Sequence, residues 1–138
     1  MASETLGASA GLILLDSDVL IDFQRGVQAS RQWMLSIGSS DAAVPGSVAL
    51  EMIVGSRSKL ELKQSVNLLD SLKICWHSAE DNELAWKLAE KHSLSTGLSL
   101  SDYLIAAQTL NQGAILYTFN LKHFKMISGL AVREPYPR

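Results

Sequence analysis

The sequence has one cysteine and three prolines among its 138 residues, and aromatic residues make up only 7% of it. One cysteine, Cys75, cannot form an intramolecular disulfide, and its apolar neighbours indicate a buried structural thiol in a reducing compartment. No hydrophobic run is long enough to cross a membrane, and the N-terminus lacks the basic segment of a signal peptide. We therefore expect a cytoplasmic protein without membrane association.

The chain also lacks an excess of either charge, because 12 Lys and Arg residues face 14 Asp and Glu residues. This balance argues against a protein that grips nucleic acid by charge alone. With 47% apolar residues, the chain is long enough for one well-packed core and short for two. We expect a flexible leader over residues 1–10, rich in Ala and Ser, followed by a single domain over residues 11–138.

Continuous apolar runs punctuate the chain. Those at 12–15 and 114–117 predict strands buried on both faces, and a shorter strand is predicted at 42–44. Helical patterns are predicted at 19–25, 29–37, 47–55, 60–72, 79–92 and 102–111. This alternation indicates an α/β fold in which a short parallel sheet lies between layers of helices. In such sheets the ligand site lies beyond the carboxyl ends of the strands.

Four polar residues stand in otherwise apolar stretches: Asp16, Glu51, Asp102 and Asn120. Asp16 and Asn120 follow the two buried strands, whereas Glu51 shares a polar stripe with Ser47 and Gly55 on an otherwise apolar helix. Carboxylates placed against core elements are unfavourable unless they surround a cation, most simply a divalent metal. The sequence therefore predicts a pocket in which Asp16, Glu51 and Asp102 hold a metal.

Each of these residues also has a simpler interpretation. Asp16 and Asn120 are suited to cap the helices that follow them. Asp102 is suited to the first turn of a helix with Ser101 as its N-cap, and Glu51 to a solvated helix surface. The shared pocket rests on the mutually consistent positions of all four.

Four segments carry these polar residues together with their neighbours. They are LLDSDVLID at 14–22, VALE at 48–51 with Gly55 behind it, LSLSDYLIAA at 98–107 and YTFNLKHF at 117–124. In this order they resemble the motifs of PIN-domain ribonucleases, and in particular the VapC-type toxins of type II toxin–antitoxin systems. The resemblance extends from about residue 12 to residue 135, which is nearly the whole chain.

The resemblance implies a single α/β/α PIN domain and an endoribonuclease, dependent on Mg²⁺ or Mn²⁺, that cuts single-stranded or loop RNA. Asp16 and Asp102 would be the principal metal ligands, and Glu51 would hold the metal through a water or orient the attacking water. Asn120 would be the fourth catalytic position, where some relatives carry aspartate. Attack by water would leave 5′-phosphate and 3′-hydroxyl ends.

The resemblance also assigns supporting residues. Those expected to orient the acidic cluster through hydrogen bonds or charge are Ser17, Asp18 and Thr118. Independently of the resemblance, three residues could contact a phosphate of RNA or could simply lie on a solvated surface: Arg25, Lys122 and His123. Because His123 stands where many relatives carry a further acid, the number of metals, one or two, stays open.

Partners follow from the same resemblance and from a surplus of apolar helical surface. Most of this surface should be core, and some should serve a homodimer interface or a groove for an antitoxin segment. Its residues are Trp33, Met34, Ile37, Leu60, Val66, Leu68, Leu69 and Leu72. An antitoxin could inhibit the site by placing a basic side chain among the acids.

Two other classes of protein share features with this sequence. A catalytically weak or inactive PIN-like domain that binds RNA or acts as an adaptor is consistent with the neutral Asn120. A phosphoacceptor or phosphatase domain is suggested by Asp16-Ser17-Asp18, but a receiver domain needs an aspartate after a middle strand. The segment at 44–46 supplies none, and the segment at 117–120 lacks the late acidic pair of a phosphatase.

Overall fold

The computed structural model describes residues 11–38 and 41–138, so the predicted leader at 1–10 lies outside the described residues. The strands pair in parallel in the order β3-β2-β1-β4-β5. Their bounds are β1 Ile13–Leu15, β2 Ala42–Pro45, β3 Ile74–Cys75, β4 Ile115–Tyr117 and β5 Val132–Arg133.

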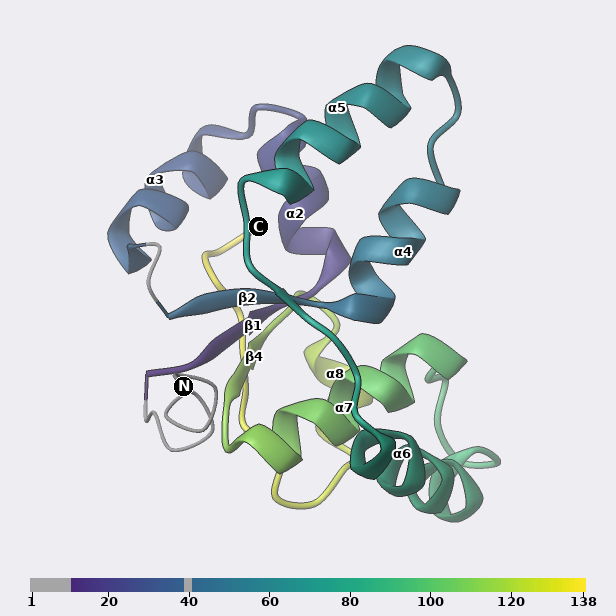
Figure 1. The fold of residues 1–138 in the computed structure, drawn as a ribbon. Coiled ribbons are helices and arrows are strands. Elements are labelled where there is room, and N and C mark those ends of the chain that lie inside the picture. The colour runs from purple at the N-terminus through teal and green to yellow at the C-terminus, as the bar shows by residue number, and fades with distance from the viewer. Residues whose placement is uncertain (1–10, 39–40) are drawn as a thin grey trace, which may run out of the picture.

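Helices cover both faces of this sheet (Figure 1). One layer contains α2 (Ser17–Gln24), α3 (Gln28–Ile37), α4 (Gly46–Val54) and α5 (Lys59–Asp70). The other contains α6 (Ala79–His92), α7 (Leu100–Gln112) and α8 (Leu121–Phe124). The α/β/α architecture predicted from the alternation of strands and helices is confirmed.

The core lies on both sides of the central strands. Leu14, Val44 and Leu116, one from each central strand, are fully buried, as expected for parallel strands between two helical layers. The predicted strands at 12–15, 42–44 and 114–117 correspond to β1, β2 and β4 within one residue at each end. The edge strands β3 and β5 were not predicted, because each has two residues and neither is fully buried.

The register of β1 and β4 determines what lies at the carboxyl end of the sheet. Leu15 pairs with Tyr117, so the next residues, Asp16 and Thr118, are neighbours. The chain passes from β1 to β2 on one side, and β4 later joins β1 on the other side. The strand order therefore reverses at β1. In open α/β sheets such a reversal leaves a crevice at the carboxyl ends of the strands, and ligands bind there.

Most of the apolar helical surface singled out in the sequence lies in or against the core, as expected. Leu69 is buried, and the residues that pack partly buried against the core are Trp33, Met34, Ile37, Leu68 and Leu72. Leu60 and Val66, both on α5, stay 67% and 39% exposed. None of the described helices is long and apolar enough to span a membrane.

Candidate active site

Asp16 lies at the centre of the candidate site and uses its two oxygens differently. It is the N-cap of α2, where Oδ1 accepts a hydrogen bond from the backbone N–H of Ser17 at 2.7 Å. Oδ2 accepts a hydrogen bond from the Thr118 hydroxyl, also at 2.7 Å. Asp16 and Thr118 are both buried. The capping interpretation of Asp16 is therefore correct for one oxygen, while the other faces the end of β4.

The environment of Asp16 disfavours its negative charge. Burial, with the negative charges of Asp18 and Asp102, raises the pKa of Asp16 from 3.8 to about 7. Hydrogen bonds from Thr118 and Ser17 oppose this rise and lower the pKa. A bound cation would relieve the repulsion among these carboxylates, so the local electrostatics favour a positively charged ligand.

Asp18 connects the start of α2 to the loop after β4. Its Oδ2 accepts a hydrogen bond from the backbone N–H of Phe119 at 3.0 Å and lies 3.3 Å from the Thr118 hydroxyl. Burial raises the pKa of Asp18, against these hydrogen bonds. Its Oδ1 is buried and has no hydrogen-bond partner among the residues that the structure describes. The structure thus brings Asp18 and Thr118 beside Asp16, and Ser17 contacts Asp16 through its backbone.

Asp102 stands in the first turn of α7, where it forms a capping box. Its Oδ2 accepts a hydrogen bond from the backbone N–H of Ser99 at 2.9 Å, and Ser99 Oγ accepts one from the N–H of Asp102. The prediction that Ser101 is the N-cap is wrong. The helix begins at Leu100, so Ser99 is its N-cap and forms a capping box with Asp102, whereas Ser101 already lies inside the helix.

Glu51 comes from α4, which lies in the same helical layer as α2. It is exposed on α4, and with Ser17 and Arg25 it lines a cavity of about 430 Å³ between α2, α4 and α5. The predicted polar stripe is only partly correct, since Gly55 lines this cavity but Ser47 does not. Ser47 is instead buried and hydrogen-bonded to another part of the chain.

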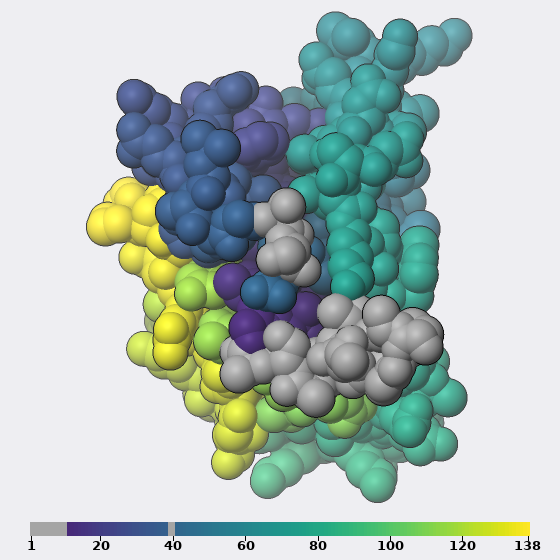
Figure 2. Space-filling view, turned by 60° about the vertical axis from the view of Figure 1, so that its left-hand side comes forward, coloured from purple at the N-terminus to yellow at the C-terminus, as the bar shows by residue number. Residues whose placement is uncertain are grey.

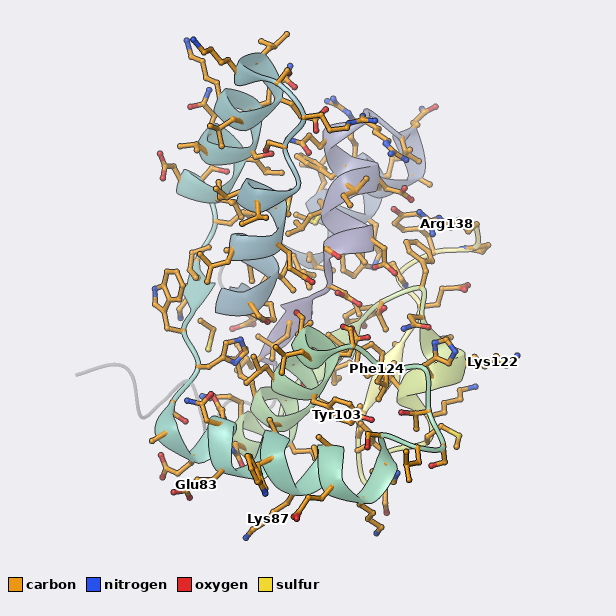
Figure 3. The ribbon with its side chains drawn as sticks, turned by 90° about the vertical axis from the view of Figure 1, so that its right-hand side faces the viewer. Glu83, Lys87, Tyr103, Lys122, Phe124 and Arg138 are labelled. Carbon is orange, nitrogen blue, oxygen red and sulfur yellow. The ribbon has the colours of Figure 1, made fainter. Side chains whose placement is uncertain are left out.

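The remaining predicted site residues lie on or beside α8. Asn120 is its N-cap residue but makes no side-chain capping bond, and its N–H donates to Thr118 Oγ1 at 3.0 Å. Lys122 is exposed and projects outward from α8 (Figure 3). His123 packs against Gly97, where an added Cβ would lie 3.1 Å from its Nε2. Of the three RNA candidates, Arg25 lines the cavity that also contains Glu51.

Metal binding can be tested against this geometry. Within residues 11–38 and 41–138, no three His, Cys, Asp or Glu side chains are gathered closely enough to hold a metal ion. Asp18 and Asp102 lie close enough for their charges to act on Asp16, and one oxygen of Asp18 is buried without a partner among the described residues. These oxygen donors fit a hard divalent cation. The ligand set Asp16, Glu51 and Asp102 stays a prediction.

Comparison with known families decides what kind of domain this is. The PIN domain family matches residues 13–129. The chain belongs to the PIN domain family. It is also 32% identical to ribonuclease VapC10 of Mycobacterium tuberculosis over 120 residues, which are 86% of this chain and 90% of the relative. The predicted resemblance to VapC-type PIN domains is confirmed.

Solved structures agree on the fold of this PIN domain. A toxin–antitoxin complex from Klebsiella pneumoniae contains a chain 25% identical to it, with a TM-score of 0.75 over 91% of this chain and 99% of that chain. VapBC2 from Rickettsia felis, bound to a DNA fragment from its promoter, matches with a TM-score of 0.77 at 22% identity. That match covers 89% of this chain and 98% of the other.

The PIN domain also has a C-terminal contact that sequence reasoning missed. Tyr136 donates to Asp22 Oδ2 at 3.0 Å, and Arg138 donates to Asp22 Oδ1 at 2.9 Å. The Arg138 guanidinium lies 4.1 Å from the centre of the Phe119 ring. Figure 2 shows the yellow C-terminal residues against the blue α3, and Figure 3 shows Arg138 near the helices of this layer. Asp22 lies in the segment 14–22, but no spacing pointed to its distant partners.

Proposed function

We propose that this PIN domain is a metal-dependent endoribonuclease that cuts single-stranded or loop RNA and acts as the toxin of a toxin–antitoxin pair. The observation that carries the proposal is Asp16, a buried carboxyl at the topological switch point whose pKa is raised to about 7 beside Asp18 and Asp102. Strongly shifted carboxyl groups in a crevice are typical of catalytic and metal sites. The 32% identity to a VapC ribonuclease supports the same activity.

The metal would be Mg²⁺ or Mn²⁺, because the nearby donors are carboxylate oxygens. Asp16 and Asp102 would hold it directly, and Glu51 would do so through a water or would orient the attacking water. When bound, the metal supplies Lewis-acid stabilisation of the phosphate and lowers the pKa of water. No covalent bond between protein and RNA is required, so the ends left would be a 5′-phosphate and a 3′-hydroxyl.

The other site residues would hold these groups in place. Thr118 orients one oxygen of Asp16 and opposes the rise in its pKa, which favours the ionised form that a metal needs. Asp18 fixes the loop that carries Asn120, whose amide oxygen remains a potential ligand or hydrogen-bond acceptor. Arg25 would contact an RNA phosphate at the cavity that it shares with Glu51.

The test is cleavage of end-labelled single-stranded, hairpin and duplex RNA by the purified protein with Mn²⁺, Mg²⁺ or EDTA. We expect cleavage of single-stranded and loop RNA with either metal, none with EDTA, and 5′-phosphate ends. RNA binding without cleavage under every condition would instead support the non-catalytic alternative. That alternative gains weight from the neutral Asn120 and from the lack of a three-acid cluster among the described residues.

Assignment as a toxin implies a protein partner, the antitoxin. We infer that the protein acts in the cytoplasm and that an antitoxin encoded beside it places a basic side chain among Asp16, Glu51 and Asp102. The complex from Klebsiella pneumoniae, a toxin–antitoxin complex at 25% identity, supports such a partner. Expression of the chain alone should arrest growth, and co-expression with its encoded neighbour should relieve the arrest. A complex that leaves all three acids open to solvent would exclude this mode of inhibition.

We also infer a homodimer in which the exposed Leu60 and Val66 of α5 lie at the interface. Light scattering on the isolated protein should give twice the chain mass, and the Leu60→Glu variant should give the mass of one chain. A wild-type protein that stays monomeric at micromolar concentration would rule the dimer out.

A further inference from the structure

The first turn of α4 is capped by a residue 30 positions away. The N-cap residue of α4, Pro45, makes no side-chain capping bond. Instead, the backbone N–H of Ser47 donates to His77 Nε2 at 3.0 Å, and Ser47 Oγ lies 3.0 Å from the same nitrogen. Because the first N–H groups of a helix have no partner within the helix, His77 supplies the acceptor that a local cap would otherwise provide.

The chain around His77 is packed tightly against the start of α4. Ile74 pairs with Val44 in the sheet. Trp76 covers Gly46, where an added Cβ would lie 2.5 Å from a carbon of the Trp76 ring. A larger residue at position 46 would force one of the two apart, so glycine permits the close approach that brings His77 to Ser47.

The same segment is tied to α7 on its other side. The fully buried Gln108 of α7 donates from its amide to the carbonyl oxygen of Cys75 at 2.8 Å. Further along α7, Asn111 donates to Asp81 Oδ1 at 2.8 Å, and Asp81 forms the capping box of α6 with Ser78. Residues 75–81 therefore form a bracket, anchored to α4 through Ser47 and to α7 through Gln108 and Asn111.

The bracket works with neutral histidine. Nε2 must lack a proton to accept from the Ser47 N–H, so the ring proton lies on Nδ1. Nδ1 is buried and has no hydrogen-bond partner among the described residues. Burial lowers the pKa of His77, although the charge of Asp81 opposes this. The lowered pKa agrees with a neutral ring whose Nε2 is free to accept a hydrogen bond.

The two helices joined by this bracket carry two of the predicted catalytic acids. Glu51 lies one turn after Ser47 on α4, and Asp102 lies in the first turn of α7. We propose that His77 is a positioning residue that holds the Glu51 helix in place against the Asp102 helix and so sets the geometry of the cleavage site. This inference rests on the proposed ribonuclease function for its catalytic consequence only.

A matched pair of amide substitutions tests the role of the acceptor. His77→Gln places an amide oxygen near the position of Nε2, whereas His77→Asn is one methylene shorter and withdraws it from Ser47. His92→Asn, in the last turn of α6, is the control for loss of a histidine. The first measurement is amide hydrogen exchange at Ser47, which needs neither metal nor RNA. We expect exchange about 5- to 10-fold faster in His77→Asn, and wild-type exchange in His77→Gln and His92→Asn.

The second measurement is steady-state RNA cleavage with Mn²⁺. Misplacement of Glu51 should lower kcat of His77→Asn about 10- to 100-fold with KM for RNA within about twofold of wild type, and His77→Gln should restore kcat. If His77→Asn does not fold, Ser47→Ala removes the hydroxyl contact alone and should lower kcat about two- to threefold.

The outcomes separate the two proposals. Wild-type protein that cuts no RNA refutes the ribonuclease, while Ser47 exchange still tests the cap. A folded His77→Asn variant with wild-type kcat, or with unchanged Ser47 exchange, overturns the positioning role even if the ribonuclease assignment stands. Equal loss of kcat in His77→Asn and His77→Gln would also contradict it, because the acceptor would then not be the feature that matters.

Discussion

The Thr118 hydroxyl donates a hydrogen bond to Asp16 Oδ2 at 2.7 Å, although the two residues are 102 positions apart. The pairing of Leu15 with Tyr117 places them side by side at the carboxyl end of the sheet. Thr118 Oγ1 also accepts from the N–H of Asn120, so its single proton is directed toward the carboxylates. This bond links the topology of the sheet to the chemistry of the site.

Removal of this bond by Thr118→Val should weaken both the fold and the activity. The valine leaves Asp16 Oδ2 buried without its donor, so the free energy of unfolding should fall by about 1–3 kcal/mol. Since the hydrogen bond lowers the pKa of Asp16, its loss raises that pKa, and the pH profile of cleavage should move to higher pH. Thr118→Ser keeps the hydroxyl and should behave as wild type. A Thr118→Val profile that coincides with that of wild type would contradict the assigned role.

Stability should depend on pH through Asp16. Its pKa is raised from 3.8 to about 7, so the folded state prefers the protonated form. Without divalent metal, the stabilisation is present below about pH 4 and is lost as pH rises through about 7, a change on the order of 4 kcal/mol. Asp18, whose pKa is also raised, acts in the same direction.

Denaturant unfolding between pH 4 and 8 in EDTA measures this change. Asp16→Asn should flatten the curve and be more stable than wild type at pH 8. Asp70→Asn, at an exposed position at the end of α5, should follow the wild-type curve. A wild-type protein whose stability increases from pH 5 to pH 8 would show that Asp16 is not held in an environment that disfavours its charge.

The two arginine–carboxylate pairs of the described chain should differ in strength. Arg138 pairs with the buried Asp22 and stacks on Phe119, whereas Arg57 pairs with Glu61 on the exposed surface of α5. Arg138→Ala should lower the free energy of unfolding by about 1–2 kcal/mol, and Arg57→Ala should leave it nearly unchanged because solvent screens the exposed pair. Urea denaturation checks both, and equal effects would mean that the C-terminal contact adds no stability.

Arg25 should act on RNA binding and leave the fold unchanged. Its position at the cavity beside Glu51 predicts that Arg25→Gln raises KM for RNA. It should also reduce the slope of log affinity against log salt by about 0.7, the value for one phosphate contact on single-stranded nucleic acid. Arg31→Gln, which removes a guanidinium 5.6 Å from the Phe23 ring, is the matched control. Identical salt slopes for both variants would remove Arg25 from the RNA path.

The central sheet could be predicted because its strands are buried on both faces and read as continuous apolar runs. The edge strands could not, since Ile74–Cys75 and Val132–Arg133 are too short to show a pattern. Asp16 and Asn120 were predicted to lie together because both follow buried strands of one parallel sheet, and in the structure Thr118 links them through two hydrogen bonds. The capping error at Asp102 was local, because Ser99 and Ser101 are both good caps and only the helix start distinguishes them.

The contacts that escaped prediction join residues far apart in sequence without a shared pattern. Asp22 with Arg138, Ser47 with His77, and Gln108 with the Cys75 carbonyl depend on how the helices pack on the sheet. Ser47 shows the difficulty clearly. Its place on the stripe with Glu51 suggested a site residue, and only the packing of the segment after β3 reveals its bond to His77.

The most direct test of the account is metal-dependent RNA cleavage by Asp16→Asn and Asp102→Asn beside wild type. Both substitutions keep the shape of the side chain and remove its charge, so circular dichroism should show folded proteins. With Mn²⁺ and single-stranded RNA we expect wild type to cut and both variants to lose at least about 100-fold in kcat. Undiminished cleavage by both folded variants would contradict the assignment of the active site.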